Sequence, residues 1–268
     1  MYGGCMKVRV LSAAIVLAIL IPFICIGGYP FAIVVGVVSV LAYKEILDLK
    51  KSHKDIPNVV KVLGLLVLIY LVLGNYGINS LDFAVNYPRI LLPLILLLLP
   101  TIFYKKEEYT TKDAFYFIGT TLLLGMLFNL LIVIRNINVY LLLYLLSITI
   151  FTDTFAYVIG CLIGKHKMAP SISPKKSWEG AVAGLIGGTA ISVIFYSNLI
   201  GDFSLKLVFI TMILSIVGQM GDLVFSKIKR ENDIKDFSNI MPGHGGILDR
   251  LDSISFVIFV YVVLIWFL

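Results

Sequence analysis

The chain has 268 residues, of which 59% are hydrophobic and only 14% are charged, and its mean hydropathy is +0.99. Because soluble domains carry about 25% charged residues, this composition excludes an ordinary soluble domain and indicates a polytopic membrane protein. The net charge of +6 is typical of basic cytoplasmic loops rather than of a nucleic-acid partner, and three cysteines without CxxC spacing exclude a disulfide framework and a thiolate metal site.

The apolar segments begin at the N-terminus, where Lys7 and Arg9 precede a hydrophobic run that has no convincing cleavage site after it. We therefore expect an uncleaved first span, which Gly27 and Gly28 join to the second in a tight helical hairpin. Segments of about 17–25 apolar residues cross a bilayer, and the pattern predicts an all-α, polytopic transmembrane bundle with about nine of them. Eight or ten spans remain alternatives, and the expected ranges are 8–27, 29–47, 58–75, 87–104, 114–134, 138–163, 179–199, 205–227 and 252–268.

The distribution of lysine and arginine predicts the orientation. With nine spans and a cytoplasmic N-terminus, only Arg89, Arg135 and Lys206 fall on the far side of the membrane.

We expect a single integral domain of the cytoplasmic membrane over 1–268. Its N-terminal helices, 1–135, would face lipid or form an oligomer, and its catalytic helices, 136–268, would carry cytoplasmic loops. No small-xxx-small seam is distinctive enough to predict a dimer interface.

Asp153 lies inside the sixth predicted span, between Thr152 and Thr154. An ionisable group there is costly, so it should be paired, protonated or placed on a polar cavity. We expect it to belong to a cavity.

The next polar segment, 171–180, holds hydroxyls and two lysines at the start of the seventh span: Ser173, Lys175, Lys176 and Ser177. Cations and helix N-termini both favour anions, so the segment resembles a phosphate-holding loop. Ordinary anchoring of the lysines at the cytoplasmic surface is the alternative, and Trp178 is typical of an interfacial anchor.

Asp222, Ser226 and Lys229 follow each other at i, i+4 and i+7 and therefore share one face of the eighth predicted helix. If the loop that follows folds back, Asp222 can meet Asp249. Two carboxylates suit Mg²⁺, which also takes water and phosphate oxygens. The alternatives are a solvated helix end and, for Asp249 and Asp252, simple capping of a helix N-terminus.

The intervening turn, 242–246, reads Pro-Gly-His-Gly-Gly. Such a turn allows successive N–H groups to form an anion-binding concavity. His244 would bind phosphate, act as an acid or hold the turn.

In order, these residues closely resemble the signature of the CTP:phosphatidate cytidylyltransferases: Ser226-Lys-Ile-Lys-Arg230, Lys235-Asp236, the 242–246 turn and Asp249-Arg-Leu-Asp252. The 173–180 and Asp153 segments resemble other motifs of that family. The resemblance implies cytidylyl transfer from CTP to phosphatidic acid or a related anionic lipid, Mg²⁺ with a second, monovalent cation such as K⁺, and a homodimer. It implies that the metal ligands are Asp222 and Asp249. The implied catalytic residues are Ser226, Lys229, Arg230, Asp236 and His244. The implied substrate-binding residues are Asp153, Ser173, Lys175, Lys176, Ser177, Lys235, Gly245, Gly246 and Arg250.

Two other interpretations stay open at the level of sequence. One is a different CTP-dependent lipid enzyme, a CDP-archaeol synthase or a polyprenol kinase, because the lipid-tail pocket is not readable from the motifs. The other is an ion-coupled transporter that uses Asp153 and Asp222. Transporters commonly show interrupted helices in corresponding halves, and no such symmetry is visible here.

Overall fold

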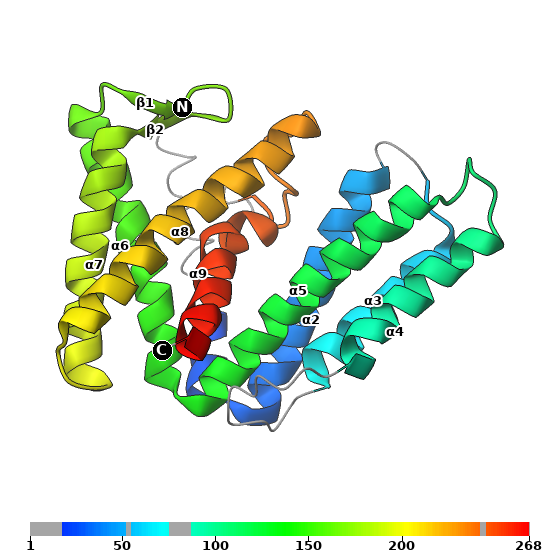
Figure 1. The fold of residues 1–268 in the computed structure, drawn as a ribbon, viewed down its shortest axis with the longest axis horizontal. Helices are drawn as coiled ribbons and strands as arrows, with labels where there is room; N and C mark the ends of the chain where they lie inside the picture. Colours follow the sequence, from blue (N-terminus) through cyan, green and yellow to red (C-terminus); the bar gives the residue numbers. More distant parts are fainter. Residues whose placement is uncertain (1–17, 52–54, 75–86, 242–244, 268) are drawn as a thin grey trace. The chain divides into compact units, whose positions relative to one another are not determined.

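A computed structural model describes residues 18–51, 55–74, 87–241 and 245–267 (Figure 1). Its helices group into two compact units. The first comprises Met1–Asn136 with Asp236–Leu248, and the second comprises Ile137–Lys235 with Asp249–Leu268. The first unit therefore includes a segment, 236–248, from the signature region near the C-terminus.

The first unit is built from helices whose bounds follow the predicted apolar segments. After helical residues 18–26 come α2 (Gly28–Lys51), α3 (Asn58–Leu73), α4 (Tyr87–Leu98) with the short 3-10 helix η1 (Leu99–Ile102), and α5 (Thr111–Ile137). The predicted break lies at Gly27 and Gly28, whose φ angles of +66° and +58° favour glycine. Arg135 of α5 donates to the carbonyls of Ile24 and Cys25 at this break, which satisfies groups that a helix end leaves without partners.

The second unit contains α6 (Val139–Ile163), β1 (Lys167–Ala169), β2 (Ser173–Ser177), α7 (Trp178–Leu199), α8 (Leu205–Glu231) and α9 (Leu248–Phe267). Three of these helices begin at side-chain caps, supplied by Asn138, Ser177 and Ser204. The strands pair antiparallel into a hairpin beside the ends of α6 and α7 (Figure 1). The sequence predicts only a loop at this position.

Helices α6 and α7 pack closely through small residues. Gly180, Gly184 and Gly188 recur every fourth residue on α7 and abut the α6 backbone. A Cβ atom at Gly184 would lie 2.6 Å from the carbonyl oxygen of Thr152, so only glycine permits this approach. Small residues allow close backbone contact between membrane helices. The sequence predicted no such seam, and this one packs two helices of the same chain against each other.

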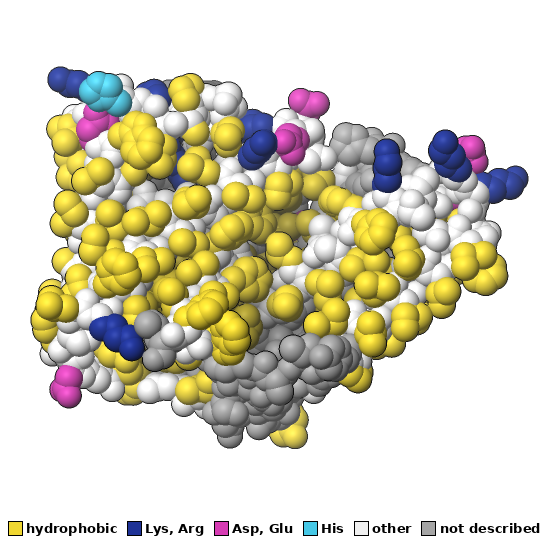
Figure 2. Space-filling view, viewed as in Figure 1, with side chains coloured by type: hydrophobic (Ala, Val, Ile, Leu, Met, Phe, Trp, Pro, Cys, Tyr) yellow, Lys and Arg dark blue, Asp and Glu magenta, His cyan; other side chains and the backbone are white. Residues whose placement is uncertain are grey.

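Six described helices are long and apolar enough to cross a membrane: α2, α5, α6, α7, α8 and α9. The helices Asn58–Leu73 and Pro88–Ile102 are apolar but shorter, and most of the first predicted span lies outside the described residues. Figure 2 shows hydrophobic side chains over the sides of the helices, with charged groups mainly near helix ends. The protein is thus an all-α integral membrane protein, and the count of nine spans stays a prediction.

Candidate active site

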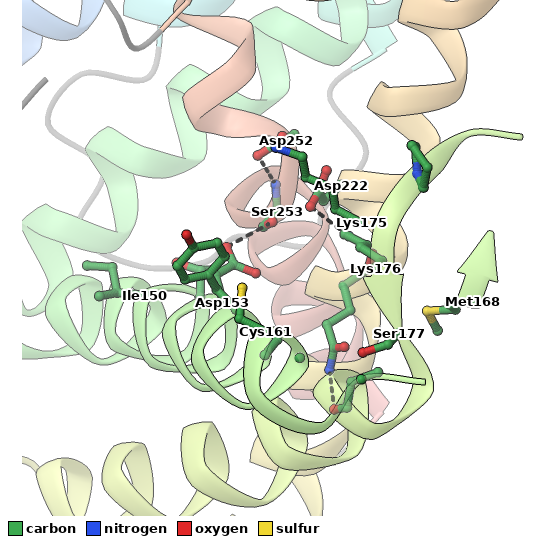
Figure 3. A pocket seen from close by; sticks show the side chains of 18 of the residues that line it. Ile150, Asp153, Cys161, Met168, Lys175, Lys176, Ser177, Asp222, Asp252 and Ser253 are labelled. Carbon is green, nitrogen blue, oxygen red and sulfur yellow. Dashed lines mark hydrogen bonds and ion pairs between the residues drawn. The ribbon is translucent and has the colours of Figure 1, made fainter. Parts of the chain in front are cut away.

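A cavity of about 840 Å³ lies within the second unit (Figure 3). Its lining comes from α6, the β hairpin, α7, α8 and α9. Eight charged side chains line it: Asp153, Lys167, Lys175, Lys176, Asp222, Asp249, Arg250 and Asp252. Most of these come from the segments that the sequence analysis singled out. Residues far apart in the chain therefore form one polar cavity, with both charge signs represented.

Asp222 of α8 lies at the centre of one group of contacts. One of its carboxylate oxygens is 2.6 Å from the Lys176 ammonium, which the hairpin supplies. The other accepts a 3.1 Å hydrogen bond from Ser226, one turn later on α8. The predicted shared face of Asp222 and Ser226 is confirmed by this bond. Both side chains of the Lys176–Asp222 pair remain about a quarter exposed, so the pair is open to a ligand entering the cavity.

Asp249 forms a second, more buried pair. The Lys229 ammonium donates to its Oδ1 at 2.6 Å, and the two side chains are only 10% and 5% exposed. An unpaired buried charge carries a large desolvation penalty, and each member of this pair compensates the charge of the other. Since Asp249 follows directly on the first residue of α9, this pair joins the end of α8 to the beginning of α9. Lys229 is therefore directed to Asp249 rather than to Asp222.

Asp153 contacts a third segment of the cavity, the first two turns of α9. The Ser253 hydroxyl donates to Asp153 at 3.5 Å, and the Ser253 backbone N–H donates to Asp252 at 2.8 Å (Figure 3). Asp222 lies near enough to interact electrostatically with both Asp153 and Asp252. The expectation that Asp153 belongs to a cavity is met. Asp252 belongs to the signature, with capping of the helix N-terminus as the alternative, and the structure places it on the cavity wall; Ser253, the next residue, was not considered.

The hairpin is held by residues at its two ends. Ser177, 3% exposed, accepts from the Gly180 N–H and so caps α7, although it also lines the cavity. The Arg230 guanidinium donates to the carbonyl of Ile172 in the hairpin turn and to that of Ile234. Arg230 thus links the end of α8 to the hairpin instead of lining the cavity. Gln219, missed in the sequence, receives a 3.4 Å contact from Lys176 at its backbone carbonyl.

Other described residues of the predicted site do not line the cavity. Ser173, Lys235 and Asp236 are described but are not part of the cavity lining, and His244 lies outside the described residues. Gly245, with φ +83°, pairs with Met241 in the first unit. Gly246 is buried there as well, where an added Cβ atom would meet the Glu45 carboxylate at 2.4 Å.

The cavity offers oxygen ligands but no complete cage for a metal. Among the described residues, no group of three or more His, Cys, Asp or Glu side chains is arranged to hold an ion. Mg²⁺ does not require such a group, because it usually takes one or two carboxylates and completes its shell with water and phosphate oxygens. The carboxylates of Asp222 and Asp249, both on the cavity wall, fit that kind of site.

Comparison with known proteins agrees with this geometry. Residues 7–268 match the model of the cytidylyltransferase family. The chain is 34% identical to the phosphatidate cytidylyltransferase of Bacillus subtilis over 270 residues, which cover 98% of each protein. It is 33% identical to the phosphatidate cytidylyltransferase of Staphylococcus haemolyticus over 257 residues, or 94% of this chain and 96% of that protein.

Proposed function

The chain belongs to the cytidylyltransferase family, and from that premise we propose that it transfers the cytidylyl group of CTP to phosphatidic acid, forming CDP-diacylglycerol and pyrophosphate. The observation that carries the proposal is the cavity in which Lys175 and Lys176 lie beside the carboxylates of α6, α8 and α9. Such a site suits two phosphate-bearing substrates better than a neutral one.

The reaction makes particular demands on this cavity. A phosphate oxygen of the lipid attacks the α-phosphorus of CTP, a new P–O bond forms, and the bond to the β-phosphate breaks so that pyrophosphate leaves. The nucleophile is already anionic, so no strong base is required, and catalysis depends on positioning and charge stabilisation. Lys175 and Lys176 would offset the repulsion between the two anions. Lys229 would hold Asp249 in place through their 2.6 Å pair.

We propose that Asp222 and Asp249 hold Mg²⁺ when CTP is bound. The ion would supply charge neutralisation on the nucleotide phosphates, and K⁺ or a similar monovalent cation would occupy a second position. Lys176 and Ser226 already contact Asp222, so these side chains would orient its carboxylate.

The proposal includes an arrangement in the membrane. Nine spans with a cytoplasmic N-terminus would direct the hairpin and the C-terminal end of α8, with Lys227, Lys229 and Arg230, to the cytoplasm. CTP would then enter from water and the lipid from the cytoplasmic leaflet of the cell membrane. We further propose a homodimer.

A direct assay tests the proposed reaction. Purified protein in detergent or liposomes should release pyrophosphate from CTP only when phosphatidic acid and Mg²⁺ are both present, and CDP-diacylglycerol should appear in equal amount. Unsaturated archaetidic acid in a parallel reaction tests the lipid class. Pyrophosphate release without a lipid product, or product formation with archaetidic acid alone, would contradict the proposal.

Replacing Lys176 should weaken nucleotide use. Lys176→Met removes the cation that pairs with Asp222, so we expect kcat/KM for CTP to fall about 10- to 100-fold, the loss typical when a partner that orients a metal ligand is removed. Steady-state pyrophosphate release measures this.

The matched control for that substitution is Lys227→Met. Lys227 lies on α8 with its side chain 62% exposed and only a 3.7 Å contact to Glu231, so its loss should leave kcat/KM within about twofold. Equal effects of the two substitutions would mean that Lys176 acts only through the net charge of the surface.

A further inference from the structure

A buried acid in the first unit contacts residues 236–248, the signature segment, through three hydrogen bonds. Glu45 of α2 is 1% exposed. Its Oε1 accepts from the Ser238 hydroxyl at 2.6 Å and from the Ile247 N–H at 2.8 Å, and its Oε2 accepts from the Leu248 N–H at 2.9 Å. One carboxylate thus contacts both ends of the segment 238–248, about 200 residues away in the sequence.

The contacts fall at the beginning of α9. The first N–H groups of a helix have no partner within the helix, and they carry the positive end of its dipole. Glu45 satisfies the N–H of Leu248, the first residue of α9, and that of the residue before it. A carboxylate is the acceptor that suits this position best, because hydrogen bonds to an ionised group are stronger than neutral ones.

Gly246 makes this approach possible. An added Cβ atom there would lie 2.4 Å from Oε1 and 2.8 Å from the carboxyl carbon of Glu45. The glycine therefore serves the packing of the acid, a role that the sequence did not predict; binding of substrate by Gly246 stays a prediction. The segment and the acid are complementary in both shape and charge.

We propose that Glu45 is a positioning residue for the cavity, although it does not line it. Asp249 follows Leu248 directly in the chain and lines the cavity. Its carboxylate pairs with Lys229. By accepting hydrogen bonds from the Ile247 and Leu248 N–H groups, Glu45 fixes the residue at which α9 begins, and Asp249 and Asp252 follow within the next four residues of that helix. The catalytic part of this inference rests on the proposed function, while the structural part, the restraint on the segment, does not.

The test compares Glu45→Gln with Asp48→Asn in the full-length protein. Gln keeps the size of the side chain, but its amide nitrogen cannot accept the bonds that one carboxylate oxygen accepts. Asp48 lies on the same helix and is exposed, which makes it the matched control. Trypsin cleavage after Lys235, at the start of the signature segment, reports opening of that segment, and pyrophosphate release reports kcat and the KM for CTP.

We expect Glu45→Gln to be cleaved about tenfold faster than wild type, because a lost hydrogen bond to a charged group raises the population of the open segment. Its kcat should fall about 10- to 100-fold with the KM for CTP changed much less, since displaced catalytic groups cost turnover. Asp48→Asn should match wild type in both measurements. Wild-type cleavage and wild-type kcat in Glu45→Gln would overturn the proposal, and so would a lower kcat without faster cleavage.

Two other variants keep the test decisive if Glu45→Gln does not fold. Ser238→Ala removes one of the three donors, and we expect the same changes at smaller size. Gly246→Ala should also accelerate cleavage, whereas Gly36→Ala on α2, where a Cβ atom would be 3.9 Å from its nearest contact, should not. Absence of pyrophosphate release in wild type would refute the proposed function alone, because the cleavage rates would still decide whether Glu45 restrains the segment.

Discussion

Asp222→Asn should abolish pyrophosphate release from CTP, lowering turnover by about 100-fold or more, while the protein stays folded. The substitution preserves the shape of the side chain and removes the charge that faces Lys176 and, in the proposed complex, the metal ion. Little stability should be lost, because Lys176 is 26% exposed and water can solvate it when its partner is neutral. Turnover and melting temperature in detergent measure the two effects.

A control and a double substitution sharpen this test. Asp202→Asn changes an exposed carboxylate just before the other end of α8 and should leave turnover unchanged. If Asp222 serves only to neutralise Lys176, the double variant Asp222→Asn/Lys176→Met should recover much of the activity lost in Asp222→Asn. We expect no recovery, because the metal ligand is still missing. Recovery, or full activity of Asp222→Asn alone, would contradict the metal assignment.

Gly184→Val should cause the largest loss of stability. Its Cβ atom would lie 2.6 Å from the Thr152 carbonyl oxygen and 3.0 Å from the Ala156 Cβ, and a backbone carbonyl cannot rotate away as a side chain can. Overpacking typically costs about 1–3 kcal/mol, and a clash with backbone belongs at the upper end of that range. The helices α6 and α7 would have to separate, which would also displace Asp153, the residue after Thr152. We expect a clearly lower melting temperature together with lost turnover.

Gly119→Val is the matched control for that substitution. Gly119 lies in α5, and a Cβ atom there would meet nothing within 4 Å. Because glycine is the poorer helix former, the melting temperature should stay the same or rise slightly. The two variants are compared by size-exclusion chromatography after heating. Equal melting temperatures for both would mean that the α6–α7 seam tolerates larger side chains.

The helices, the break between the first two of them and one contact within α8 were predicted from the sequence. The apolar segments predicted the helices closely, because a membrane span needs a long run of apolar residues and little else. The break at Gly27 and Gly28 was also predicted, because positive φ angles favour glycine. The i, i+4 spacing of Asp222 and Ser226 predicted their contact, because helical geometry alone brings such residues together.

Contacts between distant segments were not readable in this way. The sequence predicted a shared helix face for Asp222 and Lys229 but not the pairing of Lys229 with Asp249, nor the hydrogen bonds of Arg230 to backbone carbonyls of the hairpin turn and of residue 234. Long side chains reach several partners, and which one they meet depends on how helices cross. The contact of Gly180, Gly184 and Gly188 with α6 was not predicted either, because the helix that such glycines meet depends on the fold.

Composition, local periodicity and a contiguous signature were enough to predict the membrane character, most helices and the family. The tertiary structure decided which charges share the cavity, and it assigned Gly246 to the approach of Glu45. The hydrogen bonds of Glu45 join residues about 200 positions apart. Such pairings follow from the packing of whole helices in space, which no local pattern encodes.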